Sequence, residues 1–169
     1  MVDNVSPEVR SQIMAQVKSK GMKPEMRVRR LIHRLGYRYR LHRADLPGNP
    51  DLVFAPRQKI IFVHGCFWHR HKDCKRVRIP ATNRDYWLAK LKRNQVRDSQ
   101  NIALLEEAGW SVFIVWECQL QDISALTERL VTFLGQAQPL NTYLAGISRP
   151  DSTTAWSQIR SETGVHRPN

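Results

Sequence analysis

The sequence predicts one domain of the α/β class. Its 169 residues, of which 41% are hydrophobic, are enough for a single compact domain with a substantial core and too few for two. Periodic hydrophobic patterns predict elements in the order α, β, β, β, α, β, α. We expect this domain to cover residues 1–135. Residues 136–169 should form a loosely ordered tail, because their polar composition buries too little apolar surface to offset the entropy of ordering.

Two helices are expected at the N-terminal end. Residues 6–20 begin with Ser-Pro and end in lysines before Gly21, which predicts a short basic helix within a basic arm over residues 1–21. A second helix should begin at Pro24 and end before Gly36. Its apolar positions share one face and are Val28, Leu31, Ile32 and Leu35.

Three strands are expected next, two of them as a hairpin. Between residues 37 and 41, apolar or aromatic side chains alternate with arginine, a period of two that is typical of a half-exposed strand. Residues 51–54 and 60–63 are apolar runs separated by a turn at residues 56–58. These two runs should therefore pair with each other.

The C-terminal half is expected to add a helix, a strand and a helix. Residues 85–108 predict one long helix or two consecutive ones, ended by Gly109. Residues 110–116 predict a buried strand, and residues 124–134 a capped amphipathic helix. The apolar side of this last helix consists of Ile123, Leu126, Leu130, Val131 and Leu134.

The net charge of the chain indicates which kinds of partner it binds. Lysine and arginine total 27 against 15 acidic residues, a formal net charge of +12, which favours a polyanion and above all nucleic acid. No apolar run reaches the roughly 18 residues that span a bilayer, so we expect no membrane association. The N-terminus lacks the pattern of a secretory signal, and we expect a cytoplasmic protein.

The segment over residues 64–74 concentrates metal-binding side chains. Cys66, His71 and Cys74 are spaced to surround one ion, and the distant Cys118 can complete a tetrahedral Cys3His zinc site. Such a closed site would be structural, since it would order a loop that has no core of its own. His69 can replace His71 in this set, and the alternative is that the cysteines pack as small apolar residues.

Asp51 opens one strand of the predicted hairpin, and the other strand ends just before His64. Because these positions are neighbours across a hairpin, we expect Asp51 and the main-chain carbonyl of Val63 to offer hard oxygen ligands to Mg²⁺. A turn or cap residue is the alternative for Asp51. If His71 binds zinc, His64 and His69 are left beside this site and favour proton transfer.

Two further carboxylates occupy less specific positions. Glu25 lies at a helix start, where it either stabilises the helix dipole or takes part in function. Asp98 lies in a polar patch of the long helix, where it either orients a histidine through a hydrogen bond or faces solvent.

Adjacent aromatic side chains stand out in the polar, cationic segment. Phe67 and Trp68 cannot both point inward easily, and projecting rings of this kind insert between base pairs and unstack them. We therefore expect Phe67 and Trp68, together with Trp87, to act as a wedge in DNA.

Several of these motifs together resemble the very-short-patch mismatch repair endonucleases. The similar segments are residues 46–51, 64–69, 80–82, 87–98 and 109–118. The resemblance extends over roughly residues 8–135 and implies a fold similar to the restriction endonucleases, a mixed central β-sheet flanked by helices, with a structural zinc site.

The resemblance also implies an activity. Members of this family nick one strand 5′ to the thymine of a T·G mismatch, such as arises when 5-methylcytosine deaminates, and so start very-short-patch repair. We expect two catalytic Mg²⁺ ions, a structural Zn²⁺ and a product with a 5′-phosphate. The expected substrate is double-stranded DNA, and the expected state is a monomer, because a lone mismatch lacks two-fold symmetry.

Carried over position by position, the resemblance assigns roles. His69 would activate water and be held by Asp98, with His64 and Glu25 assisting through the hydrated metal shell. The other implied residues are the Mg²⁺ ligands Asp51 and Val63 (through its carbonyl), the zinc ligands Cys66, His71, Cys74 and Cys118, and the wedge residues Phe67, Trp68 and Trp87.

Two other functions fit the same residues. A zinc-containing DNA-binding module without catalysis would need only the basic charge and the aromatic side chains. A restriction-type endonuclease would use the same metal chemistry on matched sites.

Overall fold

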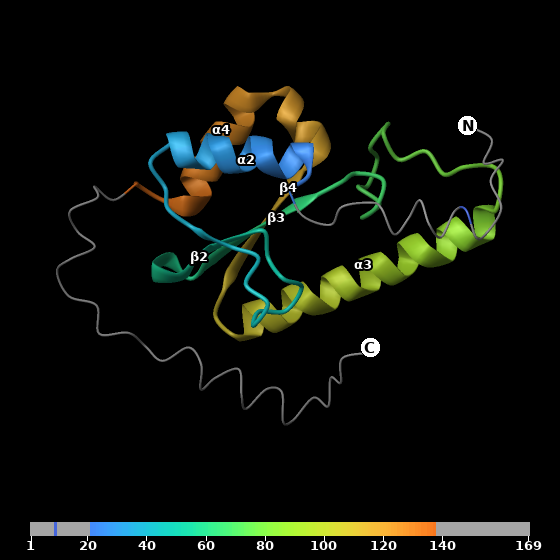
Figure 1. Ribbon diagram of the computed structural model, residues 1–169, viewed down its shortest axis with the longest axis horizontal. Coiled ribbons are helices and arrows are strands. Elements are labelled where there is room, and N and C mark those ends of the chain that lie inside the picture. Colours follow the sequence, from blue (N-terminus) through green and yellow to red (C-terminus); the bar gives the residue numbers. More distant parts are fainter. Residues whose placement is uncertain (1–8, 10–20, 138–169) are drawn as a thin grey trace.

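The sheet of the computed structural model lies between helices on both of its faces (Figure 1). The model describes residue 9 and residues 21–137. Helices α2 and α4 cover one face, and α3 covers the other. The elements are α2 (Lys23–Arg34), β1 (Arg40–Leu41), β2 (Leu52–Phe54), η1 (Ala55–Arg57), β3 (Lys59–His64), α3 (Arg84–Glu107), β4 (Ser111–Trp116), η2 (Glu117–Gln121) and α4 (Ile123–Leu134).

The four strands are hydrogen-bonded in the order β1-β2-β3-β4 and form a mixed sheet. β1, β2 and β3 are successively antiparallel, whereas β4 runs parallel to β3 after the long crossover through α3. The register pairs Leu52 with Ile61 and Val63 with Val115. The predicted hairpin and the α/β class are therefore confirmed, and the carboxyl ends of β3 and β4 lie side by side.

Alternate residues of the central strands enter two separate cores. Leu52 and Ile61 join the core beneath α2 and α4, whereas Val53, Ile60 and Phe62 join the core beneath α3. Helices cover both faces, so both sets of side chains are buried. This explains why β2 and β3 have continuous apolar sequences and not an alternating pattern.

Local signals set the helix ends. Pro24 lies in the first turn of α2, and Gly36, with φ of 89°, follows its end. α3 is one continuous helix, which decides between the two possibilities left by the sequence. α4 is capped by Asp122, whose side chain accepts a hydrogen bond from the Ala125 amide at 3.0 Å.

Three sequence-based expectations need correction. The strand expected over residues 37–41 is paired only at Arg40–Leu41, because Tyr37 and Tyr39 pack edge-on against Phe54 instead. β4 is less buried than predicted, since it is the last strand of the described sheet and only Val115 in it is fully buried. The apolar side of α4 is narrower than predicted, because two of its residues are exposed: Ile123 and Val131.

Other expectations fall outside the described residues. These are the basic helix over residues 6–20, of which only residue 9 is described, and the tail over residues 136–169, of which only residues 136 and 137 are described. In the part of the chain that the structure describes, no helix has both the length and the apolar character needed to cross a membrane.

Candidate active site

Three cysteines and a histidine converge where β3 and β4 end. Cys66 follows β3, and Cys118 lies in η2 directly after β4, so the parallel pairing of the two strands brings these distant residues together. The ligand atoms of Cys66, His71, Cys74 and Cys118 all lie within 4.8 Å of one another. The Nδ1 atom of His71 is 3.8 Å from Sγ of Cys66 and 3.3 Å from Sγ of Cys118.

These separations fit a tetrahedral metal site. Zn–S bonds of about 2.3 Å and Zn–N bonds of about 2.1 Å place sulfur and nitrogen ligands about 3.6 Å apart. Trp116 stacks on the His71 ring, with 4.2 Å between ring centroids, and so holds its orientation. Burial raises the pKa of the Cys66 thiol to about 12, so its thiolate needs a cation beside it.

His64, His69 and Asp98 form a second cluster at the end of β3. The His64 and His69 rings are stacked, with 3.8 Å between centroids and 10° between planes. Nδ1 of His69 lies 2.5 Å from Oδ2 of Asp98. Burial tends to raise the pKa of Asp98, but the hydrogen bond from His69 and the charge of His69 lower it overall, so this carboxylate is ionised. Nδ1 of His69 therefore donates, and its Nε2 is left as the proton acceptor.

His64 is held in its neutral form. It is the last residue of β3 and is only 6% exposed. Burial, with a further contribution from His69, lowers the pKa of His64 to about 3. Since a neutral ring does not repel a cation, His64 can lie beside His69 while the latter is protonated.

Asp51, Glu25 and His42 form a third cluster. Oδ2 of Asp51 accepts a hydrogen bond from the Val63 amide at 2.7 Å, just beyond the last paired residues of β2 and β3. The N–H and C=O groups of a strand residue project to the same side, so the Val63 carbonyl also faces the Asp51 side of β3. Glu25 is buried at the start of α2, and its Oε2 accepts a hydrogen bond from the Gly21 amide at 2.5 Å.

The Asp51 carboxylate is partly buried, and its contacts do not fully offset the cost of removing its charge from water. Burial raises its pKa to about 6; the negative charge of Glu25 adds to this, whereas the Val63 amide and the charges of His42 and His69 oppose it. Val63, whose amide binds Asp51, directly precedes His64 in β3, and the His64 ring stacks on His69, so the second and third clusters are neighbours. A divalent cation would relieve the cost of ionising Asp51.

His42 was not among the residues predicted from the sequence. Its Nε2 lies 3.1 Å from Oε1 of Glu25, and its Nδ1 lies 4.0 Å from Oδ1 of Asp51. β1 and β2 pair Leu41 with Leu52, so continuing the register places His42 opposite Asp51. Pairing the strand predicted over residues 37–41 with the hairpin would have pointed to this residue.

The loop before α3 carries an aromatic cluster. Ring centroids of Phe67 and Trp68 are 5.1 Å apart, and both lie within 6.1 Å of the Trp87 ring. Phe67 and Trp68 are partly exposed, whereas Trp87 is buried behind them. Asn94 donates a hydrogen bond to the Trp68 carbonyl at 3.1 Å, one helical turn before Asp98. Helix α3 thus binds the loop through two successive turns, by Asn94 at Trp68 and by Asp98 at His69.

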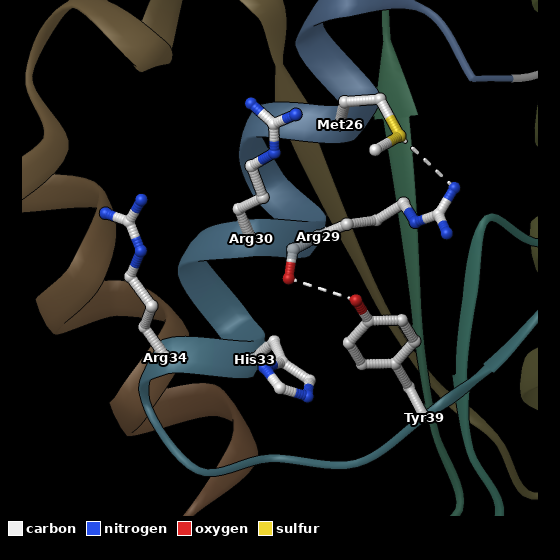
Figure 2. Close-up of a pocket in the computed structure, with 6 residues that line it drawn as sticks. All are labelled: Met26, Arg29, Arg30, His33, Arg34 and Tyr39. Atoms are coloured by element: carbon white, nitrogen blue, oxygen red, sulfur yellow. Dashed lines mark hydrogen bonds between the residues drawn. The ribbon is translucent and has the colours of Figure 1, made fainter.

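A cationic hollow lies on the outer side of α2. It has a volume of about 300 Å³. Tyr39 closes one side by donating a hydrogen bond from its hydroxyl to the Arg29 carbonyl at 3.0 Å. The lining residues, drawn in Figure 2, are Met26, Arg29, Arg30, His33, Arg34 and Tyr39. Three guanidinium groups on one helix produce a local field that attracts phosphate.

The predicted site residues thus occupy adjacent clusters. His71, and not His69, lies among the cysteines, because His69 is hydrogen-bonded to Asp98. Carboxylates and imidazoles gathered at the end of a sheet, in a strongly basic chain, are the features of a DNA endonuclease.

Comparison with known proteins identifies the family. Residues 2–76 match the family model described as "DNA mismatch endonuclease Vsr". The chain is 49% identical over 134 residues to "Type II nicking enzyme V.XorIIP" of Xanthomonas oryzae pv. oryzae, covering 79% of this chain and 98% of that protein. It is 39% identical over 132 residues to "DNA mismatch endonuclease Vsr" of Escherichia coli K12, covering 78% and 84%. The chain belongs to the Vsr endonuclease family.

A third relative extends the comparison. "Type II nicking enzyme V.NmeAIP" of Neisseria meningitidis serogroup A is 39% identical over 130 residues, which cover 77% of this chain and 92% of that protein. These relatives match 130 to 134 of the 169 residues, whereas the family model matches residues 2–76. Their similarity to this chain therefore extends to β4 as well.

Proposed function

We propose that this chain is a Mg²⁺-dependent endonuclease that nicks one strand 5′ to the thymine of a T·G mismatch and so starts very-short-patch repair of deaminated 5-methylcytosine. The observation that carries the proposal is the hydrogen-bonded His69–Asp98 pair near the partly buried Asp51 carboxylate. The names of the relatives, a mismatch endonuclease and nicking enzymes, support cleavage of one strand. A fold related to restriction endonucleases and a monomeric state belong to the same proposal.

Asp51 and the carbonyl of Val63 would hold Mg²⁺, because both offer hard oxygen atoms on the same side of β3. The chemistry that Mg²⁺ supplies when bound is neutralisation of phosphate charge and activation of water, and two ions are expected here. The raised pKa of Asp51 supports this assignment, since an ionised carboxylate in that position is stabilised by a cation.

His69 is the general base of the proposed reaction. Its Nε2 accepts a proton from the attacking water, while Asp98 fixes the ring through Nδ1. The water oxygen forms a bond to phosphorus and the bond from phosphorus to the 3′ oxygen breaks. The products are a 5′-phosphate and a 3′-hydroxyl, whose oxygen takes up a proton from solvent as it leaves. His64 supports the His69 ring by stacking, and Glu25 contributes negative charge next to Asp51.

The cysteine cluster is proposed to hold a structural Zn²⁺ through Cys66, His71, Cys74 and Cys118. The segment between β3 and α3 has no regular secondary structure, apart from turns, and carries both His69 and the aromatic pair. A bound ion would therefore order the segment that presents the general base.

The aromatic cluster supports a mechanism for mismatch selectivity. Phe67 and Trp68 would insert beside the mismatched pair, with Trp87 taking part from behind them. A mismatched pair resists unstacking less than a matched pair, so insertion there costs less free energy. The arginines on α2 would bind phosphates and position the duplex.

One experiment separates this proposal from a DNA-binding module and from a nuclease for matched sites. Duplexes that differ only in carrying T·G, T·A or C·G are incubated with the chain and with the isosteric variant Asp51→Asn, and both nicking and binding are measured. Selective nicking of T·G that is lost in Asp51→Asn, with binding retained, is the expected result. Binding without nicking by the parent chain supports the module, and equal nicking of matched duplexes supports the restriction-type enzyme.

A further inference from the structure

The cluster beside Asp51 contains a histidine that the proposed nicking reaction does not use. His42 follows β1, with a left-handed backbone (φ 45°) that side chains other than glycine adopt infrequently. Its side chain is only 17% exposed and lies between the buried carboxylate of Glu25 and the partly buried carboxylate of Asp51. A constrained backbone at a partly buried imidazole indicates that the surrounding fold fixes its position.

The contact between His42 and Glu25 does not have the geometry of a hydrogen bond. Nε2 of His42 lies 3.1 Å from Oε1 of Glu25, yet Oε1 has no hydrogen-bond partner among the described residues. Glu25 is only 4% exposed, so an unpartnered oxygen here is unfavourable. Arg29 offers partial charge compensation, with 3.6 Å between its Nη1 and Oε1. The imidazole of His42 and the carboxylate of Glu25 are therefore in contact without forming a hydrogen bond.

These distances suit two ligands of one ion. Ligands on adjacent corners of an octahedron, with bonds of about 2.1 Å, lie about 3 Å apart. One ligand atom each from Glu25, His42 and Asp51 can be chosen so that all three lie within 4.8 Å of one another. Oδ2 of Asp51 is occupied by the Val63 amide, whereas Oδ1 is the atom nearer His42.

The donor set determines which ion suits this place. Carboxylate oxygens accept Mg²⁺ and Mn²⁺ alike, but an imidazole nitrogen favours later divalent metals over Mg²⁺. We propose that Glu25, His42 and Asp51 form a site for a borderline divalent cation, for which Mn²⁺ is the probe, with His42 as its nitrogen ligand. The use of this ion in nicking rests on the proposed function, whereas its binding does not.

The test measures Mn²⁺ binding to the full chain, zinc-loaded and without DNA. Free Mn²⁺ gives a sharp electron paramagnetic resonance signal that falls on binding, and pulsed measurements detect coupling to a directly bound ¹⁴N nucleus. We expect ¹⁴N coupling in the parent chain. His42→Gln, which retains hydrogen-bonding groups, should lose this coupling and weaken Mn²⁺ binding by about 10-fold or more. Mg²⁺ binding, measured by competition, should change by less than about threefold.

His33→Gln is the matched control, since His33 is exposed on the outer side of α2 and should leave both measurements unchanged. Bound Mn²⁺ without ¹⁴N coupling in the parent chain overturns the inference, and this result does not depend on any variant folding. Coupling that persists in a folded His42→Gln overturns it as well, because the nitrogen must then come from another histidine.

The two proposals fail in different ways. Loss of mismatch nicking in a chain that shows His42-dependent Mn²⁺ coupling counts against the proposed function alone. Mg²⁺-dependent nicking of T·G duplexes by a chain without this coupling counts against the His42 site alone.

Discussion

The imidazole of His69 donates a hydrogen bond to the carboxylate of Asp98, with 2.5 Å between Nδ1 and Oδ2. The two residues come from an irregular loop and from the middle of α3, separated by 29 positions in the chain. This pair decides which nitrogen of His69 can accept a proton, and the first prediction concerns it.

Asp98→Asn should reduce the nicking rate at a T·G site by about 10²–10⁴-fold, because the amide no longer fixes and stabilises the imidazole as the proton acceptor. Single-turnover nicking with saturating enzyme measures this effect separately from binding. Asp85→Asn, a neutralised carboxylate in the first turn of the same helix, serves as the control and should retain nearly full activity. Equal losses in the two variants would point to a general effect of charge on α3.

The nicking reaction should also depend on pH through Asp51. Burial raises the pKa of Asp51 to about 6, so the metal-free fold favours the protonated carboxyl group. The contribution of this group to the free energy of unfolding is fully present below its unfolded pKa of about 4 and is lost as pH rises through about 6. Mg²⁺ requires the ionised form, so Mg²⁺ affinity should rise with pH up to about 6, by about tenfold per unit below that value, and then level off. Calorimetric titration at several pH values checks this dependence, with Asp51→Asn as the pH-insensitive control. Affinity that does not change below pH 6 would contradict it.

Cys118→Ser should remove the metal from the cysteine cluster. We expect the loss of about one zinc ion per chain and a decrease of about 2–5 kcal/mol in the free energy of unfolding, because the loop after β3 loses its cross-link to the end of β4. Elemental analysis and denaturant unfolding measure the two effects. Asp51→Asn is expected to keep its zinc, and a Cys118→Ser variant with full zinc content would remove Cys118 from the ligand set.

Trp68→Ala should reduce mismatch selectivity. A base–aromatic stacking contact contributes about 1–3 kcal/mol, so the ratio of nicking at T·G to nicking at C·G should fall by about tenfold. Competition between the two duplexes in one reaction measures the ratio directly. Tyr86→Ala, which removes an exposed ring from the first turns of α3, should change it little. An unchanged ratio in Trp68→Ala would argue against the wedge.

Neutralising the cationic hollow should weaken DNA binding without changing selectivity. Arg30→Gln combined with Arg34→Gln removes two phosphate-attracting charges from α2, so the slope of log affinity against log salt should become shallower by about two. Binding to T·G and C·G duplexes should weaken equally. Arg129→Gln on α4 is the control, because Arg129 lies over the Phe113 ring and outside the hollow. A selective loss for one duplex would indicate base contacts instead.

The sequence predicted most elements because their signals are local. Pro24 and Gly36 mark the ends of α2, and the turn near Gln58, with φ of 49°, separates the hairpin strands. The strand over residues 37–41 was predicted too long, since period-two alternation also arises when tyrosines pack against a neighbouring ring such as Phe54. The local sequence thus predicts where helices and strands occur, whereas side-chain packing determines the residues at which they begin and end.

By itself, the sequence determined the α/β class, the hairpin that brings Asp51 to the end of β3, and the set of residue types from which the cysteine, histidine and carboxylate clusters are built. Only the tertiary structure decided how those residues are divided: His71 beside the cysteines, His69 beside Asp98, and the unpredicted His42 between Glu25 and Asp51. The physical reason is that a side chain's partner depends on strand register and on parallel pairing across α3. Neither of these is contained in the spacing of residues along the chain.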